Sequence, residues 1–187
     1  MKNSLKNMIL SLFAITFASA VVVGAVFQTT KEPIEKNRIK AANEALRKVL
    51  PDFDNDAISN PVEKVMEKER VYLYTAKKGE QIVGYAVQTF TKEGYGGKFT
   101  LMVGFTPEGE IIKIETLDHQ ETAGLGDKIQ NDKSDYNKQF IGLDLGSKKA
   151  ALKADKGEID AISGSTVSSK AYIDAVNRAY TVFELLK

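Results

Sequence analysis

The sequence has no cysteine and a single histidine, His119, among its 187 residues. Without cysteine, the chain cannot form disulfides, a thiolate-ligated zinc site or a cysteine-ligated iron–sulfur cluster. One histidine also excludes a histidine-rich metal site and a haem held by two histidines. Lys and Arg number 26 against 25 Asp and Glu, and the net charge of +1 predicts no nucleic-acid partner. Any redox chemistry must therefore come from an organic cofactor.

Charge is also absent from residues 9–27, which are mostly Ile, Leu, Phe, Val and Ala. As a helix this stretch would be about 28 Å long, close to the hydrocarbon thickness of a bilayer. Lys2 and Lys6 precede it, and charges of both signs follow it. The positive-inside rule then predicts a single-pass anchor in lipid of the cell (inner) membrane, with residues 1–8 cytoplasmic and the C-terminal domain extracytoplasmic. The alternative is a signal peptide cleaved after Ala18-Ser19-Ala20, although the apolar run continues well beyond that point.

Residues 28–60 are predicted to form a connector, with a helix from Pro33 to Leu50 followed by a polar loop. A strand-rich block comes next. Its β-like stretches are residues 70–75, 81–89, 98–105 and 111–117. Two of the turns between them contain Gly79 and Gly109, so the block predicts consecutive hairpins in an antiparallel meander.

A closing helix is predicted from about Ser169 to Leu186, because apolar residues recur there at three- and four-residue spacing. Its expected buried face is Tyr172, Val176, Ala179, Phe183 and Leu186. With helices at both ends of a meander, the predicted fold is α+β, and the predicted domain covers residues 61–187.

The most informative motif is the run from Asp160 to Thr166, which stands just before the closing helix. The first N–H groups of a helix have no internal acceptor, and together with the helix dipole they favour a phosphate. A threonine hydroxyl at that point offers an oxygen that a phosphate can esterify. Ser and Thr are also the preferred N-cap residues, so a simple helix cap is the alternative.

Two glycine-containing loops precede this motif. The first is Gly94-Tyr95-Gly96-Gly97, and the second is Glu121-Thr122-Ala123-Gly124-Leu125-Gly126. Glycine lets a ligand approach the main chain closely. The alternatives are a flexible loop for the first and an ordinary strand-to-helix connection for the second.

The three motifs, in this order, resemble those of the FMN-binding domain family. The run Asp160–Thr166 is similar to the family's flavinylation motif, whose last threonine carries FMN as a phosphoester, with Ser165 where the family usually has alanine. The loop from Glu121 to Gly126 resembles Glu-Thr-Pro-Gly-Leu-Gly, with Ala123 in place of proline. Tyr95-Gly96-Gly97 falls where the family has a glycine-tyrosine-glycine turn near the flavin.

The order of elements and the short length look most like the G subunits of Rnf complexes, which couple ferredoxin and NAD electron transfer to ion translocation. The related C subunits of sodium-pumping NADH:quinone reductases share the motifs and are typically longer. This resemblance implies an electron-transfer subunit with no complete activity alone. Its expected partners are the other membrane subunits of the complex and, during maturation, a separate flavin transferase that uses FAD.

The resemblance also implies roles for individual residues, with none assigned to catalysis and none to a metal. Thr166 would carry FMN through its phosphate, and Asp160 would be part of what the transferase recognises. Lys128 would place positive charge near the flavin. The other residues expected to bind FMN are Ser163, Gly164, Ser165, Tyr95, Gly96, Glu121, Thr122, Gly124, Leu125 and Gly126.

Two other functions fit the same sequence. One is an anchored extracytoplasmic binding module without flavin, in which the threonine run only caps a helix. The other is a flavinylated carrier that serves a different extracellular electron-transfer chain.

Overall fold

The computed structural model describes residues 2–187, apart from the side chains of residues 2–4 and 35. It divides the chain into two compact units, one ending at Ala41 and the other running from Ala42 to Lys187. The predicted cytoplasmic segment, residues 1–8, starts with Met1, which lies outside the described residues.

The first helix, α1 (Lys2–Val49), contains both the predicted membrane span and the predicted connector helix. The helix continues between them because no residue there ends it. The hydroxyls of Thr29 and Thr30 bond back to carbonyl oxygens one turn earlier, and Pro33 is accommodated within the helix.

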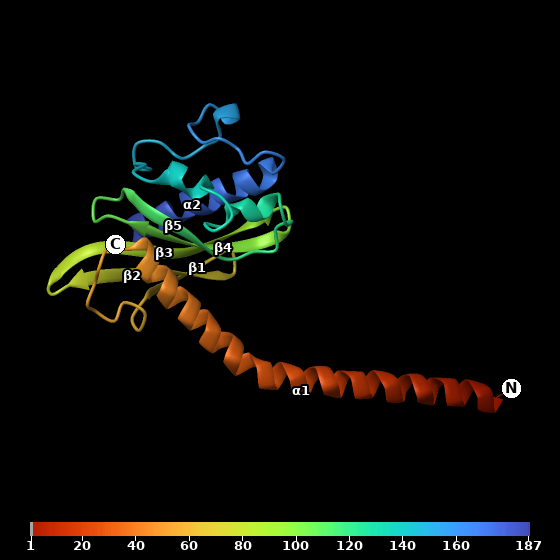
Figure 1. Cartoon of the computed structure of the whole chain (residues 1–187). Helices are drawn as coiled ribbons and strands as arrows, with labels where there is room; N and C mark the ends of the chain where they lie inside the picture. Colours follow the sequence, from red (N-terminus) through yellow and green to blue (C-terminus); the bar gives the residue numbers. More distant parts are fainter. Residues whose placement is uncertain (1) are drawn as a thin grey trace. The chain divides into compact units, whose positions relative to one another are not determined.

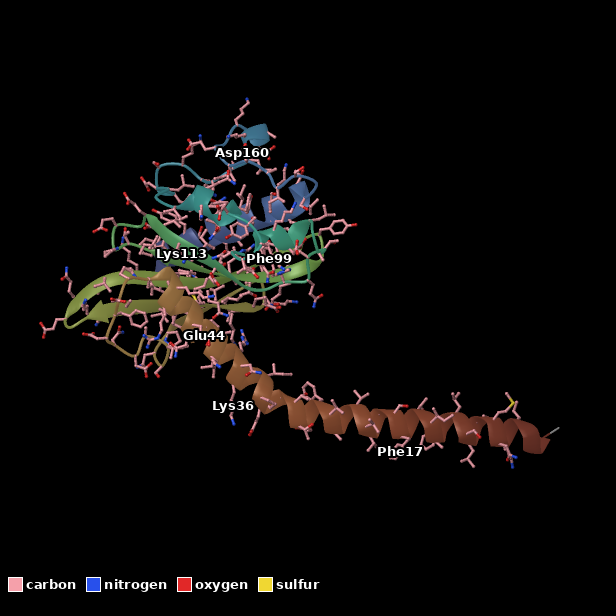
Figure 2. All side chains as sticks on the ribbon, viewed as in Figure 1. Phe17, Lys36, Glu44, Phe99, Lys113 and Asp160 are labelled. Carbon is pink, nitrogen blue, oxygen red and sulfur yellow. The ribbon has the colours of Figure 1, made fainter. Side chains whose placement is uncertain are left out.

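By length and composition, α1 is able to cross a membrane, and the side chains of its apolar stretch have no protein packed around them. Phe17, for example, is 60% exposed and projects from the helix (Figure 2). An N-terminal signal sequence meets the same criteria of length and composition, so membrane anchoring by α1 is a proposal.

Five strands form one antiparallel sheet in which every strand pairs with its neighbours in sequence. They are β1 (Val62–Met66), β2 (Glu69–Lys78), β3 (Gln81–Gly94), β4 (Gly97–Phe105) and β5 (Ile111–Asp118). With the helix α2 (Thr166–Leu186), the sheet confirms the predicted α+β fold and its meander (Figure 1). The turn between β3 and β4 is Tyr95-Gly96, the first of the two predicted glycine loops.

β1 is the strand that the sequence analysis missed. It is a short edge strand, and its apolar residues Val62 and Val65 are exposed, so no buried face marks it. Glu67 and Lys68 connect it to β2, and both have positive φ, 51° and 69°. Turns with two left-handed residues usually carry Asn-Gly or a similar pair, so Glu-Lys provides no turn signal.

α2 packs against one face of the sheet and forms the larger apolar core with it (Figure 1). Leu73, Val87 and Val103 stand side by side on neighbouring strands of this face. The predicted buried face of the helix is confirmed, with Tyr172, Val176, Ala179 and Phe183 fully buried and Leu186 partly buried.

A smaller core covers the opposite face of the sheet. It is built from the last turns of α1, the residue after them and residues of the strands: Ala42, Ala45, Leu46, Val49, Leu50, Tyr74, Ala76, Ala86 and Met102. Lys48 is held on the sheet by an ion pair with Glu115 on β5, at 2.6 Å. The end of α1 is therefore part of the folded domain.

Between β5 and α2 the chain forms three short 3-10 helices that the sequence analysis did not predict. They are η1 (Gly126–Ile129), η2 (Tyr136–Phe140) and η3 (Lys153–Asp155). The first two bury Ile129, Tyr136 and Phe140 in the larger core, and this anchors the long connection.

Candidate functional site

A cavity of about 530 Å³ lies at the N-terminal end of α2. Its volume is in the range of small-molecule sites, roughly 300–1,000 Å³. Three segments line it: the β3–β4 turn, the loop after β5 and the start of α2. The lining residues are Tyr95, Glu121, Thr122, Leu125, Gly126, Gly164, Ser165, Thr166, Val167 and Ser168. The fold thus brings together the three motifs that sequence analysis had singled out.

A tight turn leads the chain into α2. The N–H of Ser165 bonds to the carbonyl of Ile162 at 2.9 Å, and Gly164 adopts φ = 76° inside this turn. The turn is held by Ser169, whose hydroxyl accepts from the N–H of Ile162 at 2.8 Å and donates to the carbonyl of Ser165 at 2.9 Å. The end of the helix that faces the cavity is therefore firmly fixed.

The first turn of α2 is open to a ligand. Within residues 2–187, the N–H groups of Thr166, Val167 and Ser168 have no acceptor, and the first paired amide of this end is that of Ser169, which bonds to the carbonyl of Ser165. Ser165 is the N-cap residue, but its side chain makes no capping bond. Three unpaired donors and the positive end of the helix dipole are a suitable site for a phosphate.

The second glycine loop forms a turn of the same kind. The N–H of Leu125 bonds to the carbonyl of Thr122 at 3.2 Å, and Gly124 has φ = 77°. Ala123 occupies the position in this turn that proline favours. The turn leaves the side chain of Leu125 at the cavity, 45% exposed.

Glu121 connects all three walls of the cavity. One carboxylate oxygen accepts from the backbone N–H of Gly96 at 3.1 Å, and the other accepts from the hydroxyl of Ser168 at 2.6 Å. Glu121 is 8% exposed and Ser168 is 2% exposed, so both groups are largely withdrawn from water. The carboxylate therefore joins the β3–β4 turn and α2 to its own loop.

The space around this carboxylate requires glycine. A Cβ on Gly126 would lie 2.5 Å from one Glu121 oxygen and 2.7 Å from the Ser168 hydroxyl. A Cβ on Gly94 would lie 2.5 Å from the other Glu121 oxygen, and one on Gly96 would overlap the carbonyl of Gln120. The glycines of both loops thus allow the segments to approach each other.

The remaining walls are apolar and exposed. Tyr95 is 75% exposed and Val167 is 52% exposed, and both line the cavity together with Leu125. Large exposed apolar side chains grouped around a cavity usually mark a binding site. Their surface suits the face of a flat aromatic ligand.

Below the start of α2 lie two buried tyrosines. Tyr136 and Tyr172 pack edge to face at 5.3 Å, and the hydroxyl of Tyr136 donates to the carbonyl of Ser169 at 3.4 Å. Burial raises the pKa of Tyr136 to about 12, and burial also raises the pKa of Tyr172 well above its usual value. Both therefore stay neutral and form an apolar floor under the helix start.

Four predicted site residues do not line the cavity. Ser163 is exposed on the turn before α2, and Lys128 lies on η1. Gly96 and Gly124 shape the walls through their backbones. The roles predicted for Ser163 and Lys128 beside a flavin stay predictions.

Asp160 also lies outside the cavity. Its carboxylate is exposed and pairs with Lys153 at 2.7 Å, and its N–H bonds to the side chain of Gln139. Figure 2 shows it near η3, away from the sheet. Its predicted part in recognition by a transferase stays a prediction.

Sequence analysis missed Val167 and Ser168 as cavity residues. Because it started the helix at Ser169, it placed neither residue on a helical turn. The combination of an exposed Val167 and a buried Ser168 follows only when the helix begins at Thr166. Ser168 and Ser169, which precede the apolar face of the helix, were the available signal that the helix begins earlier.

The three segments that line this cavity lie within a region that is similar to a known class of domain, the FMN-binding domain. A family model described as the FMN-binding domain matches residues 94–181, which include all three cavity segments.

Similar proteins narrow the class further. The chain is 34% identical to the G subunit of the ion-translocating oxidoreductase complex of Shewanella baltica (strain OS223), over 98% of this chain and 91% of that protein. It is 35% identical to the corresponding G subunit of Pasteurella multocida (strain Pm70), over 82% of this chain and 81% of that protein. The chain belongs to the family of G subunits of ion-translocating oxidoreductase complexes.

Proposed function

We propose that this protein is a membrane-anchored electron-transfer subunit that carries FMN, joined through its phosphate to the hydroxyl of Thr166. The observation that carries the proposal is the open first turn of α2, where Thr166 is exposed at the cavity beside three unpaired N–H donors. The family membership supports FMN as the cofactor and an ion-translocating oxidoreductase as the assembly.

The residues present fit both ends of FMN. The phosphate accepts hydrogen bonds only, which matches the unpaired N–H groups of Thr166, Val167 and Ser168. The exposed faces of Tyr95 and Leu125 offer apolar surface to a flavin ring. When bound, FMN supplies one- and two-electron transfer, which no side chain of this protein provides.

Thr166 acts in this proposal as an attachment residue. In the attachment step the Thr166 oxygen bonds to the FMN phosphorus of FAD, the pyrophosphate bond breaks, AMP leaves, and the hydroxyl proton passes to a base of the transferase. The product is heavier by one FMN less one water. The exposed Thr166 is accessible to such an external enzyme, and we assign Asp160 to its recognition surface.

The apolar stretch of α1 anchors the subunit in the cell (inner) membrane. Lys6 precedes the stretch, and the chain after it carries charges of both signs, which favours a cytoplasmic N-terminus and an extracytoplasmic domain. The residues after the span connect it to the flavin domain, whose smaller core includes the end of α1 from Ala42 onward. Electrons pass between this domain and partner subunits of an Rnf-type complex that couples ferredoxin and NAD to ion translocation.

The first experiment is the intact mass of the purified full-length protein, co-produced with a flavin transferase and denatured beforehand. Wild type is expected to gain one FMN less one water, and Thr166→Ala is expected to gain nothing. Ser163→Ala is the matched control, because it removes an exposed hydroxyl of the same turn outside the cavity lining and keeps Thr166.

Other outcomes of this experiment favour other functions. A gain that Thr166→Ala keeps moves the attachment to another oxygen. No gain in any variant refutes the covalent carrier and favours the anchored binding module. If the mass gain is found but no other component of an ion-translocating complex copurifies, a carrier for another extracellular electron-transfer chain becomes the better interpretation.

A further inference from the structure

Ser165 carries a hydroxyl that the fold itself does not use. Ser165 is 7% exposed and lines the cavity. Among the residues that the structure describes, its side chain has no hydrogen-bond partner, and it makes no capping bond to α2. The hydroxyl is therefore free to donate a hydrogen bond to a ligand that enters the cavity.

The neighbouring hydroxyls are in different situations. Ser163 is exposed and outside the cavity lining. Ser169 uses its hydroxyl fully within the fold, as an acceptor from Ile162 and a donor to Ser165. Thr166 lines the cavity and is exposed. Ser165 alone in this run combines burial, a place on the cavity wall and an unused hydroxyl.

We propose that Ser165 is a phosphate ligand, whose hydroxyl donates a hydrogen bond to a phosphate oxygen of the FMN carried by Thr166. This inference rests on the proposed function and adds that Ser165 binds the phosphate but is not itself esterified. Ser165 is only 7% exposed, whereas Thr166 is exposed, so Thr166 is the more accessible residue for an external enzyme. The hydroxyl is a fourth donor beside the three unpaired N–H groups, and bonds from donors to a charged phosphate are among the stronger hydrogen bonds.

The test compares FMN-loaded and unloaded full-length wild type, Ser165→Ala and Ser147→Ala. Three quantities are measured: intact mass, the ³¹P NMR resonance of the phosphoester in the folded protein and again in urea, and the midpoint temperature Tm of thermal unfolding. The rise in Tm on loading reports contacts that the cofactor makes only in the folded state. Ser147→Ala removes the same chemical group at an exposed serine outside the cavity lining, whose hydroxyl donates only to the carbonyl of Asp144.

The proposal predicts that Ser165→Ala gains the same mass as wild type and keeps the Tm of the unloaded protein. Its ³¹P resonance should differ from that of wild type when folded and coincide with it in urea. Its rise in Tm on loading should be smaller, while Ser147→Ala should show the same mass gain, ³¹P resonance and rise in Tm as wild type.

Four results would overturn the inference. A folded ³¹P resonance identical to that of wild type means that Ser165 does not contact the phosphate. A fall in Tm of the unloaded Ser165→Ala as large as that of the loaded protein means that the hydroxyl is only structural. Loss of the mass gain in Ser165→Ala means that Ser165 is needed for attachment. If wild type itself gains no mass, the proposed function fails, and the phosphate ligand fails with it.

Discussion

Replacing Glu121 by alanine removes the one side chain that joins all three walls of the cavity. The Gly96 N–H and the Ser168 hydroxyl each lose their acceptor. An orphaned buried donor costs about 1–3 kcal/mol. Ser168 is 2% exposed, while Gly96 is partly exposed and lies near the cavity, where water can reach it. We therefore expect Glu121→Ala to lower the free energy of unfolding by about 2–4 kcal/mol.

Glu121→Gln tests whether the hydrogen bonds carry this effect. The amide oxygen can still accept from Gly96, and the Ser168 hydroxyl can rotate to accept from the amide nitrogen. The expected loss is below about 1 kcal/mol. Glu158→Ala is the control, because its carboxylate is exposed and pairs with Lys148 only at the surface, at 3.5 Å. That change should stay within about 0.5 kcal/mol of wild type.

Urea unfolding of the full-length protein in detergent measures these differences. The chain has no tryptophan and seven tyrosines, the first of them Tyr72, so tyrosine fluorescence reports the folded domain and is silent on the apolar stretch of α1. Flavin loading should fall in Glu121→Ala, since the walls are no longer held together. The reasoning is refuted if Glu121→Ala unfolds like wild type, or if Glu121→Gln is as unstable as Glu121→Ala.

Two further substitutions probe the same region. Gly126→Ala forces a methyl group against Glu121 and the Ser168 hydroxyl, so it should lower the free energy of unfolding by about 1–3 kcal/mol. It should also reduce the FMN content per protein, and a normal FMN content would contradict the close packing. Tyr136 has a pKa of about 12 when folded and about 10 when unfolded, so the native state keeps a proton that the unfolded state releases as pH rises above 10. Stability should fall by up to about 3 kcal/mol between pH 10 and 12. In urea unfolding at a series of pH values, Tyr136→Phe should show a smaller fall in stability between pH 10 and 12 than wild type. An equal fall would contradict the role of Tyr136.

Much of the fold was predictable because its signals are local. β2 to β5 are rich in β-branched and aromatic residues and are separated by glycine turns, and the closing helix has a regular apolar face. β1 was not predictable, since its turn uses Glu67 and Lys68 in left-handed conformations and its valines, Val62 and Val65, are exposed. The 3-10 helices between β5 and α2 were missed for a related reason, because each is only three to five residues long and has no periodic face.

The site was predictable in its parts but not in its connections. The glycine loops and the threonine run were visible as motifs, and the fold brings them to one cavity. The role of Glu121 was not visible, because its partners Gly96 and Ser168 are 25 and 47 residues away in sequence. Sequence spacing alone carries no information on which donors a loop carboxylate will meet after folding. Glu121 was expected to bind the flavin, but both of its carboxylate oxygens already accept hydrogen bonds within the protein.

The open form of the cavity offers a physical reason for covalent attachment. Its apolar walls, Tyr95, Leu125 and Val167, are 45–75% exposed, so they are arranged at a surface and do not enclose a ligand. A flavin on such a surface remains accessible to partner subunits that exchange electrons with it, but it gains little from burial and would dissociate easily. The proposed bond to Thr166 would keep the ring at the site at a high effective concentration without requiring deeper burial. Different parts of one site would thus serve two needs. The exposed loops keep the flavin accessible to partner subunits, and the fixed start of α2 retains it.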